Sequence, residues 1–255
     1  MTLNDSFGKL LHRFMLRHWK RVSRLSPDAE LASLRARRQQ ARQLSIPLQE
    51  LITIADSRLA IPRIGSTTFP RPAGTDWAWR PMVWRAGLTK RGLAPALNKA
   101  KIGDEIVVFH DCTRSEIAIT QQRNRREDDL APYGLTVETY HFDGSFLSLA
   151  LDLPDAACVG LQKRHIVQLS ALISREAPIT IYARLNVKHG PNTEQVMLTL
   201  PHENGEISIA FDRAYTQLNE KRTEKMWIDL MFENPAMNNI VIRDLHICRY
   251  PRAAI

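Results

Sequence analysis

The sequence predicts a mainly β protein, an antiparallel β-sandwich of the jelly-roll type, with a basic α-helical extension at its N-terminus. Apolar residues recur every three or four positions at the start of the chain, and they alternate with polar residues after Ile102. The charge divides in the same way. Residues 1–100 hold eighteen Lys and Arg against six Asp and Glu (+12), whereas residues 101–255 hold seventeen against twenty-one (−4). We therefore expect a basic helical part and a nearly neutral β domain.

The basic arm, residues 1–45, is expected to begin with an amphipathic helix over residues 1–25. One stripe of this helix is mostly apolar and consists of Leu3, Phe7, Leu10, Leu11, Phe14, His18, Val22 and Leu25. The residues expected to bind an anionic surface are Arg13, Arg17, Lys20, Arg21 and Arg24. Such a helix can lie on an anionic membrane or pack against a partner helix, and the sequence leaves both open.

A second helix is expected after Ser26. The Ser26 hydroxyl suits an N-cap, Pro27 suits the first helical position, and Asp28 and Glu30 favour the positive end of the helix dipole. Pro47 is expected to end this helix, because proline lacks the backbone N–H that a helix interior requires.

Residues 46–101 are expected to wrap the β domain as an extended segment. Six prolines interrupt regular structure there. Trp77 and Trp79 share one side of the segment if it is extended, and two roles are open for them. They pin the segment to the sandwich, or together with Trp84 they form a platform on which a ligand stacks.

The β-sandwich domain is expected over residues 102–255. Alternation with a period of two marks about nine or ten short strands separated by turns, which is typical of a sandwich or jelly roll. Asn204-Gly205 and Asp143-Gly144 each stand between two such runs. Both pairs are typical of tight hairpin turns, which need positive φ at the central residues, so consecutive strands are expected to pair antiparallel.

The last strand contains an irregularity. The apolar positions are in step up to Ile242, whereas Leu245 and Ile247 are shifted by one residue. One extra residue in a strand is the mark of a β-bulge, which we place near Arg243 and Asp244. Bulges often redirect side chains beside binding sites.

The strand at residues 179–188 carries the main candidate for a binding site. Its apolar residues alternate with a polar row that consists of Tyr182, Arg184, Asn186 and Lys188. An aromatic ring, a guanidinium group and an amide in line can hold a polar ligand such as a glycan, although a solvated sheet face has a similar composition. If the row binds a ligand, we expect that Arg184 can be replaced with little loss of stability.

Two arrangements could support catalysis, and for both we favour a structural role. His110 and Cys112 would share a strand face, where an imidazole could activate a thiol, but a buried thiol at a strand end is commoner. Asp229 and Asp244 could form the carboxylate pair of a glycosidase if they share a sheet, whereas outward, solvated positions explain them equally. The spacings of phosphate loops, nucleophile elbows and metal-binding His pairs do not occur in the sequence, so we expect no metal and no cofactor.

A run of charges stands at residues 123–129, with the sequence Arg-Asn-Arg-Arg-Glu-Asp-Asp. Because its charges compensate one another, we expect a solvated loop. The excess positive charge then belongs to the arm, and we do not expect nucleic acid as a partner of the β domain.

The cysteines and the N-terminus indicate the compartment. Cys112, Cys158 and Cys248 are odd in number and widely spaced, which fits neither a disulfide framework nor a zinc site. Charged residues interrupt the N-terminal apolar positions, so no stretch of signal-peptide length is present in the sequence. We expect a cytoplasmic protein, with peripheral attachment to a membrane as an open alternative.

Three strand sequences carry a resemblance to a known superfamily. They are Phe-Leu-Ser-Leu-Ala-Leu-Asp-Leu at residues 146–153, Tyr-Ala-Arg-Leu-Asn at residues 182–186 and Asn-Ile-Val-Ile-Arg-Asp-Leu at residues 239–245. In strand rhythm, this C-terminal half resembles carbohydrate-binding jelly rolls of the galactose-binding type. The whole chain also resembles bacterial proteins grouped as a family of unknown function. The resemblance implies a sandwich that binds carbohydrate, but it assigns no ligand residue, because the sugar-binding loops of that superfamily follow no sequence pattern.

We interpret the chain as a non-enzymatic binding or scaffold module that recognises a glycan or a protein through its sandwich. An enzyme that acts on a saccharide is the main alternative. A third reading is a protein that associates with nucleic acid or an anionic membrane through the basic arm. The binding residues proposed for the sandwich are Tyr182, Arg184, Asn186, Lys188, Trp77 and Trp79.

Overall fold

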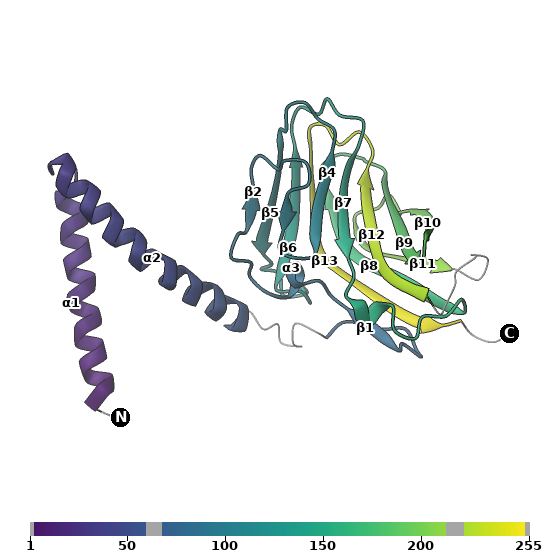
Figure 1. The fold of residues 1–255 in the computed structure, drawn as a ribbon, viewed down its shortest axis with the longest axis horizontal. Helices are drawn as coiled ribbons and strands as arrows, with labels where there is room; N and C mark the ends of the chain where they lie inside the picture. The colour runs from purple at the N-terminus through teal and green to yellow at the C-terminus, as the bar shows by residue number, and fades with distance from the viewer. Residues whose placement is uncertain (1–2, 60–67, 213–221, 253–255) are drawn as a thin grey trace. The chain divides into compact units, whose positions relative to one another are not determined.

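The computed structural model describes residues 3–59, 68–212 and 222–252 of the chain (Figure 1). The chain divides into two compact units, Met1–Ile52 and Thr53–Ile255. Helices make up the regular structure of the first unit, and every strand of the described residues belongs to the second.

Two helices form the arm, α1 (Leu3–Leu25) and α2 (Leu31–Leu59). The predicted end of the second helix before Pro47 is wrong, because α2 continues through this proline. An interior proline costs a helix about 3 kcal/mol, and the turns on both sides, rich in Leu, Ala, Gln and Arg, favour helix strongly enough to continue. Ser26 does not cap α2 as predicted. Its Oγ donates to the carbonyl of Val22 (2.7 Å) and so closes α1.

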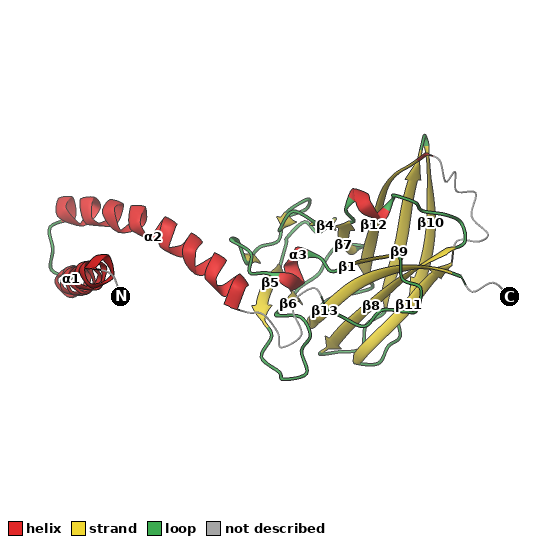
Figure 2. Cartoon of the chain, turned by 90° about the horizontal axis from the view of Figure 1, so that it is seen from below, coloured by secondary structure: helices red, strands yellow, loops and turns green. Residues whose placement is uncertain are grey.

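The second unit is an antiparallel β-sandwich, as predicted, and Figure 2 shows its two layers of strands. The first sheet has the order β11-β8-β13-β6-β5-β2, with β1 paired to β13. Its strands are β1 (Trp77–Trp79), β2 (Gly92–Leu93), β5 (Ile117–Arg123), β6 (Tyr133–Thr139), β8 (His165–Arg175), β11 (Gly205–Asp212) and β13 (Asn238–Pro251). The second sheet has the order β10-β9-β12-β7-β4-β3. Its strands are β3 (Lys101–Ile102), β4 (Ile106–His110), β7 (Leu147–Asp152), β9 (Ile181–His189), β10 (Asn192–Thr199) and β12 (Thr223–Phe232).

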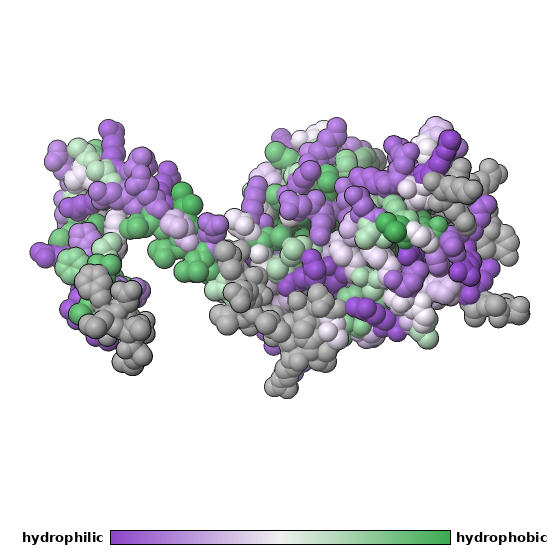
Figure 3. All heavy atoms as spheres, turned by 60° about the horizontal axis from the view of Figure 1, so that its bottom comes forward, coloured by the Kyte–Doolittle hydropathy of each residue, from purple (hydrophilic) through white to green (hydrophobic). Residues whose placement is uncertain are grey.

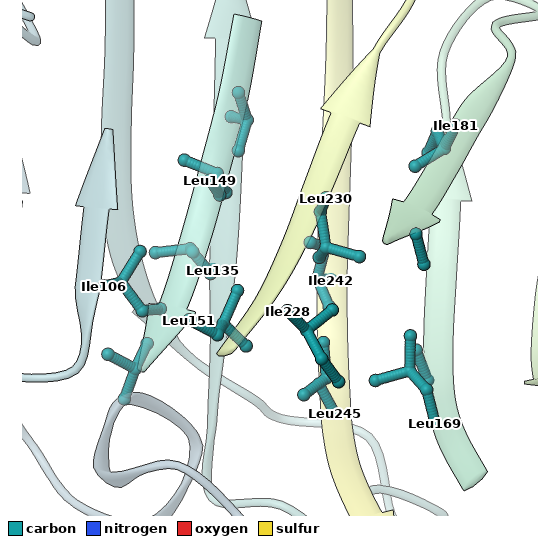
Figure 4. Close-up of a cluster of buried hydrophobic side chains, with 14 of the residues drawn as sticks. Ile106, Leu135, Leu149, Leu151, Leu169, Ile181, Ile228, Leu230, Ile242 and Leu245 are labelled. Atoms are coloured by element: carbon teal, nitrogen blue, oxygen red, sulfur yellow. The ribbon is translucent and has the colours of Figure 1, made fainter. Parts of the chain in front are cut away.

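The hydrophobic core lies between the two sheets (Figure 4). Ile106, Leu149 and Ile228 of the second sheet face Leu135 and Ile242 of the first, and each is at most 1% exposed. The alternation seen in the sequence produces this core, because successive side chains of a strand point to opposite faces. Each fully buried Leu or Ile contributes about 1.5–3 kcal/mol.

The segment that precedes β2 is part of the sandwich, and the short helix α3 (Met82–Arg85) packs into it. Trp84 of α3 is completely buried, and its Nε1 donates to the carbonyl of Ile242 (2.8 Å). Gln121 of β5 donates from Nε2 to two backbone carbonyls of the α3 turn, each at 2.7 Å. The part of the predicted segment 46–101 around α3 thus packs against the sandwich, whereas residues 46–59 are helical and belong to α2.

The predicted β-bulge in β13 is confirmed. The register between β13 and β8 shifts between Ile242 and Asp244. Side chains satisfy the carbonyls of the bulge: Trp84 donates to Ile242, and Nδ2 of Asn124 donates to Arg243 (2.8 Å). Because the bulge adds one residue, Asp244 lies on the outer face of the first sheet, while Ile242 and Leu245 both stay in the core.

Asp244 meets a buried arginine from the wrapping segment. Nη2 of Arg80 lies 2.7 Å from Oδ2 of Asp244, and the two residues are 1% and 7% exposed. The Arg80 guanidinium also stacks on the ring of Phe69, 4.8 Å from its centroid. This pair joins parts of the chain that are 164 residues apart and fixes the segment to the last strand.

We predict that replacing Arg80 by Ala destabilises the sandwich by about 3–5 kcal/mol, because the buried Asp244 loses its ion pair at 2.7 Å and keeps, among the described residues, only Nδ1 of His246 at 3.8 Å. The control is Lys188→Ala, which breaks the exposed pair of Lys188 and Glu224 (3.0 Å) and is expected to cost less than about 1 kcal/mol. Urea unfolding followed by tryptophan fluorescence measures both. Equally small losses would show that Arg80 does not anchor the segment.

We also predict that a chain beginning at residue 53, which lacks the first compact unit, folds by itself. The buried core residues lie at or beyond Val83, so the arm supplies none of them. Circular dichroism should show cooperative thermal unfolding of a soluble β protein. If the fragment is insoluble or melts without a transition, the arm is part of the folding unit.

Candidate functional site

The outer face of the second sheet collects polar and aromatic side chains from several strands. We call it the polar face and define it by the outward residues of β9 and β12 with their neighbours on β7 and β10. The register places Arg184 of β9 between Met197 of β10 and Asp229 of β12, and in the next row it places Asn186 opposite Trp227. Opposite residues have Cβ atoms about 4.5–5.5 Å apart. The pairing of the strands thus assembles one surface from distant parts of the chain.

A hydrogen-bonded cluster lies at the centre of this face. Oδ2 of Asp229 accepts from Nε (3.1 Å) and Nη2 (2.9 Å) of Arg184 and from Nδ2 of Asn186 (2.9 Å). Asn186 is 0% and Asp229 6% exposed, whereas the Arg184 side chain is 36% exposed. The buried Oδ1 of Asn186 has no hydrogen-bond partner among the described residues. The cluster therefore fixes the guanidinium and leaves one buried acceptor unsatisfied.

The pairing with Asp229 bears on the expected tolerance of Arg184 to replacement. Removing the guanidinium leaves a nearly buried carboxylate with the Asn186 amide as its one remaining side-chain donor among the described residues. An under-paired buried carboxylate is costly, so the expectation that Arg184 can be replaced with little loss of stability is not supported by this geometry.

Two aromatic side chains lie beside the cluster. The hydroxyl of Tyr182 donates to Oε2 of Glu233 (3.1 Å), and this hydrogen bond raises the pKa of Tyr182, so the phenol stays protonated. Trp227 is half-buried, and Nζ of Lys225 lies 5.9 Å from its ring centroid. Sequence reasoning did not select Trp227. Its two-residue spacing from Asp229 on an alternating strand is the signal that could have found it.

Lys188 lies at the end of the predicted polar row. It forms an exposed ion pair with Glu224 (3.0 Å), and its neighbour in the register is Lys225. Lys225 in turn pairs with Asp152 of β7 (2.8 Å). These exposed pairs form a charged border beside the cluster.

Trp77 and Trp79 lie on the first sheet, away from the polar face. In β1 they pair with Arg249 and Ile247 of β13, and Ile247 is part of the core. Their rings stack with centroids 6.5 Å apart, and both are partly buried against the core. The structure therefore favours the role of pinning the segment to the sandwich, and it does not bring these rings together with Tyr182.

His110 and Cys112 are not arranged as a base and a nucleophile. Nε2 of His110 donates to the carbonyl of Ala96 (2.9 Å), and Nδ1 accepts the backbone N–H of Cys112 (3.2 Å). Both ring nitrogens are thus engaged by the backbone. Burial raises the pKa of the Cys112 thiol, and the carboxylate of Asp143 adds to the rise, so the unreactive thiol form is favoured.

Asp229 and Asp244 do not share a sheet, so the carboxylate pair considered from the sequence is wrong. Asp229 lies on β12 of the second sheet, and Asp244 lies on β13 of the first, where it pairs with Arg80. Across residues 3–59, 68–212 and 222–252, no group of three or more His, Cys, Asp or Glu side chains could hold a metal ion.

The arm presents hydrophilic and apolar surface together (Figure 3). The exposed basic residues of α1 include Arg13, Arg17, Lys20, Arg21 and Arg24. Leu10 and Phe14 are each 67% exposed, and Leu31 is 73% exposed. A hollow of about 760 Å³ between the two helices is lined mainly by apolar residues, among them Leu11, Met15, Leu16, Trp19, Leu44 and Leu48. Neither described helix combines the length and the apolar character needed to cross a membrane.

Solved structures with a similar arrangement include three proteins of low sequence identity. The enzymatically active domain of tailspike protein 4 of bacteriophage CBA120 matches with a TM-score of 0.42 and 8% identity, over 64% of this chain and 22% of that domain. The family 11 carbohydrate-binding module of Clostridium thermocellum matches with a TM-score of 0.38 and 11% identity, over 62% of this chain and 96% of the module. The C-terminal family 22 module of Clostridium thermocellum Xyn10B matches with a TM-score of 0.38 and 8% identity, over 73% and 99%.

This chain thus spans about a fifth of the tailspike domain and nearly all of each carbohydrate-binding module. No curated protein is significantly similar to it in sequence. One family model matches residues 1–255, which include both the arm and the sandwich. The chain therefore belongs to the family described as a family of unknown function (DUF6478).

Proposed function

We propose that the protein is a non-enzymatic binding module whose polar face binds a glycan. The observation that carries the proposal is the row across β9 and β12, where Tyr182 and Trp227 lie beside the cluster of Arg184, Asn186 and Asp229. A sugar ring has an apolar face that suits an aromatic ring and a rim of hydroxyls that suits fixed donors and acceptors. The polar face offers both within neighbouring rows of one sheet.

The cluster retains hydrogen-bonding capacity for such a ligand. Arg184 uses Nε and Nη2 on Asp229, and Nη1 makes no hydrogen bond to the described residues. Oδ1 of Asn186 is an acceptor without a partner among the same residues. A sugar hydroxyl can accept from Nη1 of Arg184, whose side chain is 36% exposed, whereas Oδ1 of Asn186 is buried and lies out of reach of a ligand.

The carboxylates of this face favour binding over hydrolysis. Asp229 is held by Arg184, and Asp152 is held by Lys225 (2.8 Å). A glycosidase needs one carboxyl group that is protonated and one that is free to attack or to activate water. Ion pairs engage both of these carboxylates, which supports a binding role.

We predict that Trp227→Ala weakens glycan binding about tenfold or more, because a lost contact of about 1.4 kcal/mol already corresponds to a factor of ten. Trp227→Phe keeps an aromatic ring and should retain most of the affinity. A glycan array identifies the ligand, and calorimetry with that glycan measures the variants. Trp77→Ala on the first sheet is the matched control and should bind like the wild type.

The array and a saccharide panel together separate the rival functions. Glycan binding that is insensitive to Trp227 and Arg184 would place the site elsewhere, and an array without hits would remove the proposal. Release of product from a saccharide panel would instead support the enzymatic alternative.

A second function is supported by the arm, which we infer attaches the protein to an anionic membrane. Residues 1–52 hold ten Lys and Arg against four Asp and Glu, a balance of +6. The apolar side chains of the same helices, such as Leu10, Phe14 and Leu31, stay exposed. A basic helix with an uncovered apolar face binds at the boundary of headgroups and acyl chains.

Charge favours a membrane over a second copy of the arm. Two copies would bring together two units of +6 each, which repel one another. Anionic lipids neutralise this charge, and their acyl chains cover the apolar stripe. Each Lys or Arg near such a surface contributes about 1 kcal/mol.

We predict that the full chain floats with vesicles of phosphatidylcholine and phosphatidylglycerol, but not with phosphatidylcholine alone. Arg13→Gln/Arg17→Gln/Arg21→Gln should weaken binding about hundredfold, since three charges contribute about 3 kcal/mol. A matched control removes three exposed cations of the sandwich outside both proposed sites, Lys99, Lys101 and Arg114, and should leave flotation unchanged. Absence of binding to both vesicle types would exclude the membrane, and a concentration-dependent oligomer that Leu10→Ser/Phe14→Ser disrupts would identify a second copy as the partner.

A further inference from the structure

The loop between β5 and β6 separates the charges that the sequence places side by side. Its residues 124–132 are held in place by Asn124, whose Nδ2 donates to the carbonyls of Ala131 and Arg243 (2.8 Å each). The run at residues 123–129 lies in or beside this loop, as the sequence predicts. The expectation that its charges compensate one another is wrong, because the fold directs the acidic and basic side chains to different neighbours.

Two of the three acidic residues of the run are already engaged. Asp129 and Asp128 both pair with Arg243 of the bulge, and the side chain of Asp129 is only 5% exposed. Oδ2 of Asp129 also accepts the backbone N–H of Arg126 (2.9 Å). These carboxylates are therefore engaged by a different arginine and by the backbone, rather than by the guanidinium groups of their own run.

The basic side of the run lines a hollow of about 680 Å³ on the first sheet. Its charged lining consists of Arg91, Arg123, Arg125, Arg126, Arg243 and Asp129. Asp129 and Arg243 neutralise one another, and Arg91 lies over the ring of Tyr133, 5.9 Å from its centroid. The guanidinium groups of Arg123, Arg125 and Arg126 remain around the hollow. The side chains of Arg123, Arg125 and Arg126 are exposed and make no ion pair or hydrogen bond with the described residues.

We propose that this arginine pocket binds a ligand that carries phosphate- or sulfate-type oxyanions. Guanidinium groups hold such oxyanions through paired, parallel hydrogen bonds. Like charges gathered around one concave surface raise the local potential, and an oxyanion relieves their mutual repulsion. Gln122 and Asn124, which also line the hollow, add uncharged polar groups beside the arginines.

The lining also bears on the kind of anion. Proteins that bind single-stranded nucleic acid stack bases on aromatic side chains. The residues that line this hollow include no aromatic side chain. The pocket thus suits an oxyanion group itself, either free or as an ester on a carbohydrate chain, more than it suits a nucleotide base.

The test compares dextran sulfate with uncharged dextran, and uses inorganic pyrophosphate as the free oxyanion. The test uses the full chain with Arg13→Gln/Arg17→Gln/Arg21→Gln, so that the basic arm contributes less to polyanion binding. This protein should bind dextran sulfate and not dextran. Arg123→Gln/Arg125→Gln/Arg126→Gln should weaken this binding at least tenfold without changing the thermal midpoint. The matched control is Lys99→Gln/Lys101→Gln/Arg114→Gln, which removes three exposed charges outside the pocket and should change the affinity less than about twofold. The single variant Arg125→Gln serves if the triple variant does not fold.

The two probes distinguish the sources of the oxyanion. Pyrophosphate binding that the pocket variant loses identifies a free oxyanion, whereas loss for dextran sulfate alone identifies an ester on a polymer; both support the proposal. Equal weakening by the pocket and control variants would mean that net charge alone is responsible and would overturn it, as would an unchanged affinity of the pocket variant. Trp227→Ala should leave dextran sulfate binding intact, so the pocket and the polar face can fail independently.

Discussion

The β-bulge at Arg243 is the constraint on which much of the sandwich depends. The extra residue turns Asp244 out of the core, where the guanidinium of Arg80 meets it, and it leaves carbonyls that Trp84 and Asn124 satisfy. Through these contacts one irregularity in the last strand anchors both the wrapping segment and the loop after β5. These side chains stabilise the bulge, because a buried carbonyl without a hydrogen-bond donor is costly.

The bulge also shapes one of the two faces that carry our proposals. Arg243 itself engages the acidic residues of the β5–β6 loop, which frees Arg123, Arg125 and Arg126 to line the arginine pocket. The polar face lies on the opposite sheet and does not depend on unpaired charges. There, the central carboxylate of Asp229 fixes its neighbours by hydrogen bonds. The arginine pocket attracts anions, whereas the polar face offers aromatic rings for stacking and fixed hydrogen-bonding groups.

The two units differ in charge and in the exposure of their apolar residues. The arm combines a net charge of +6 over residues 1–52 with exposed apolar side chains, whereas the sandwich buries its core residues between two sheets. A helix pair that exposes so much apolar surface gains stability from a surface that covers it. Attachment through the arm would hold the binding sites of the sandwich near an anionic surface without using any residue of those sites.

The sequence by itself determined the features that depend on neighbours a few residues away. Alternation gave the strands and their inward faces, a one-residue shift located the bulge before Asp244, and spacing put Tyr182 and Arg184 on one side of a strand. Only the tertiary structure decided which strands lie next to each other. The hairpins predicted at Asp143-Gly144 and Asn204-Gly205 do not form, because each of these turns joins strands of different sheets. The tertiary structure paired Arg184 with Asp229 and brought Trp227 to the same face, because cross-strand register is set by contacts between residues far apart in the chain. For the same reason, the sequence pattern could not show that a charge run would be split between two sides of a loop.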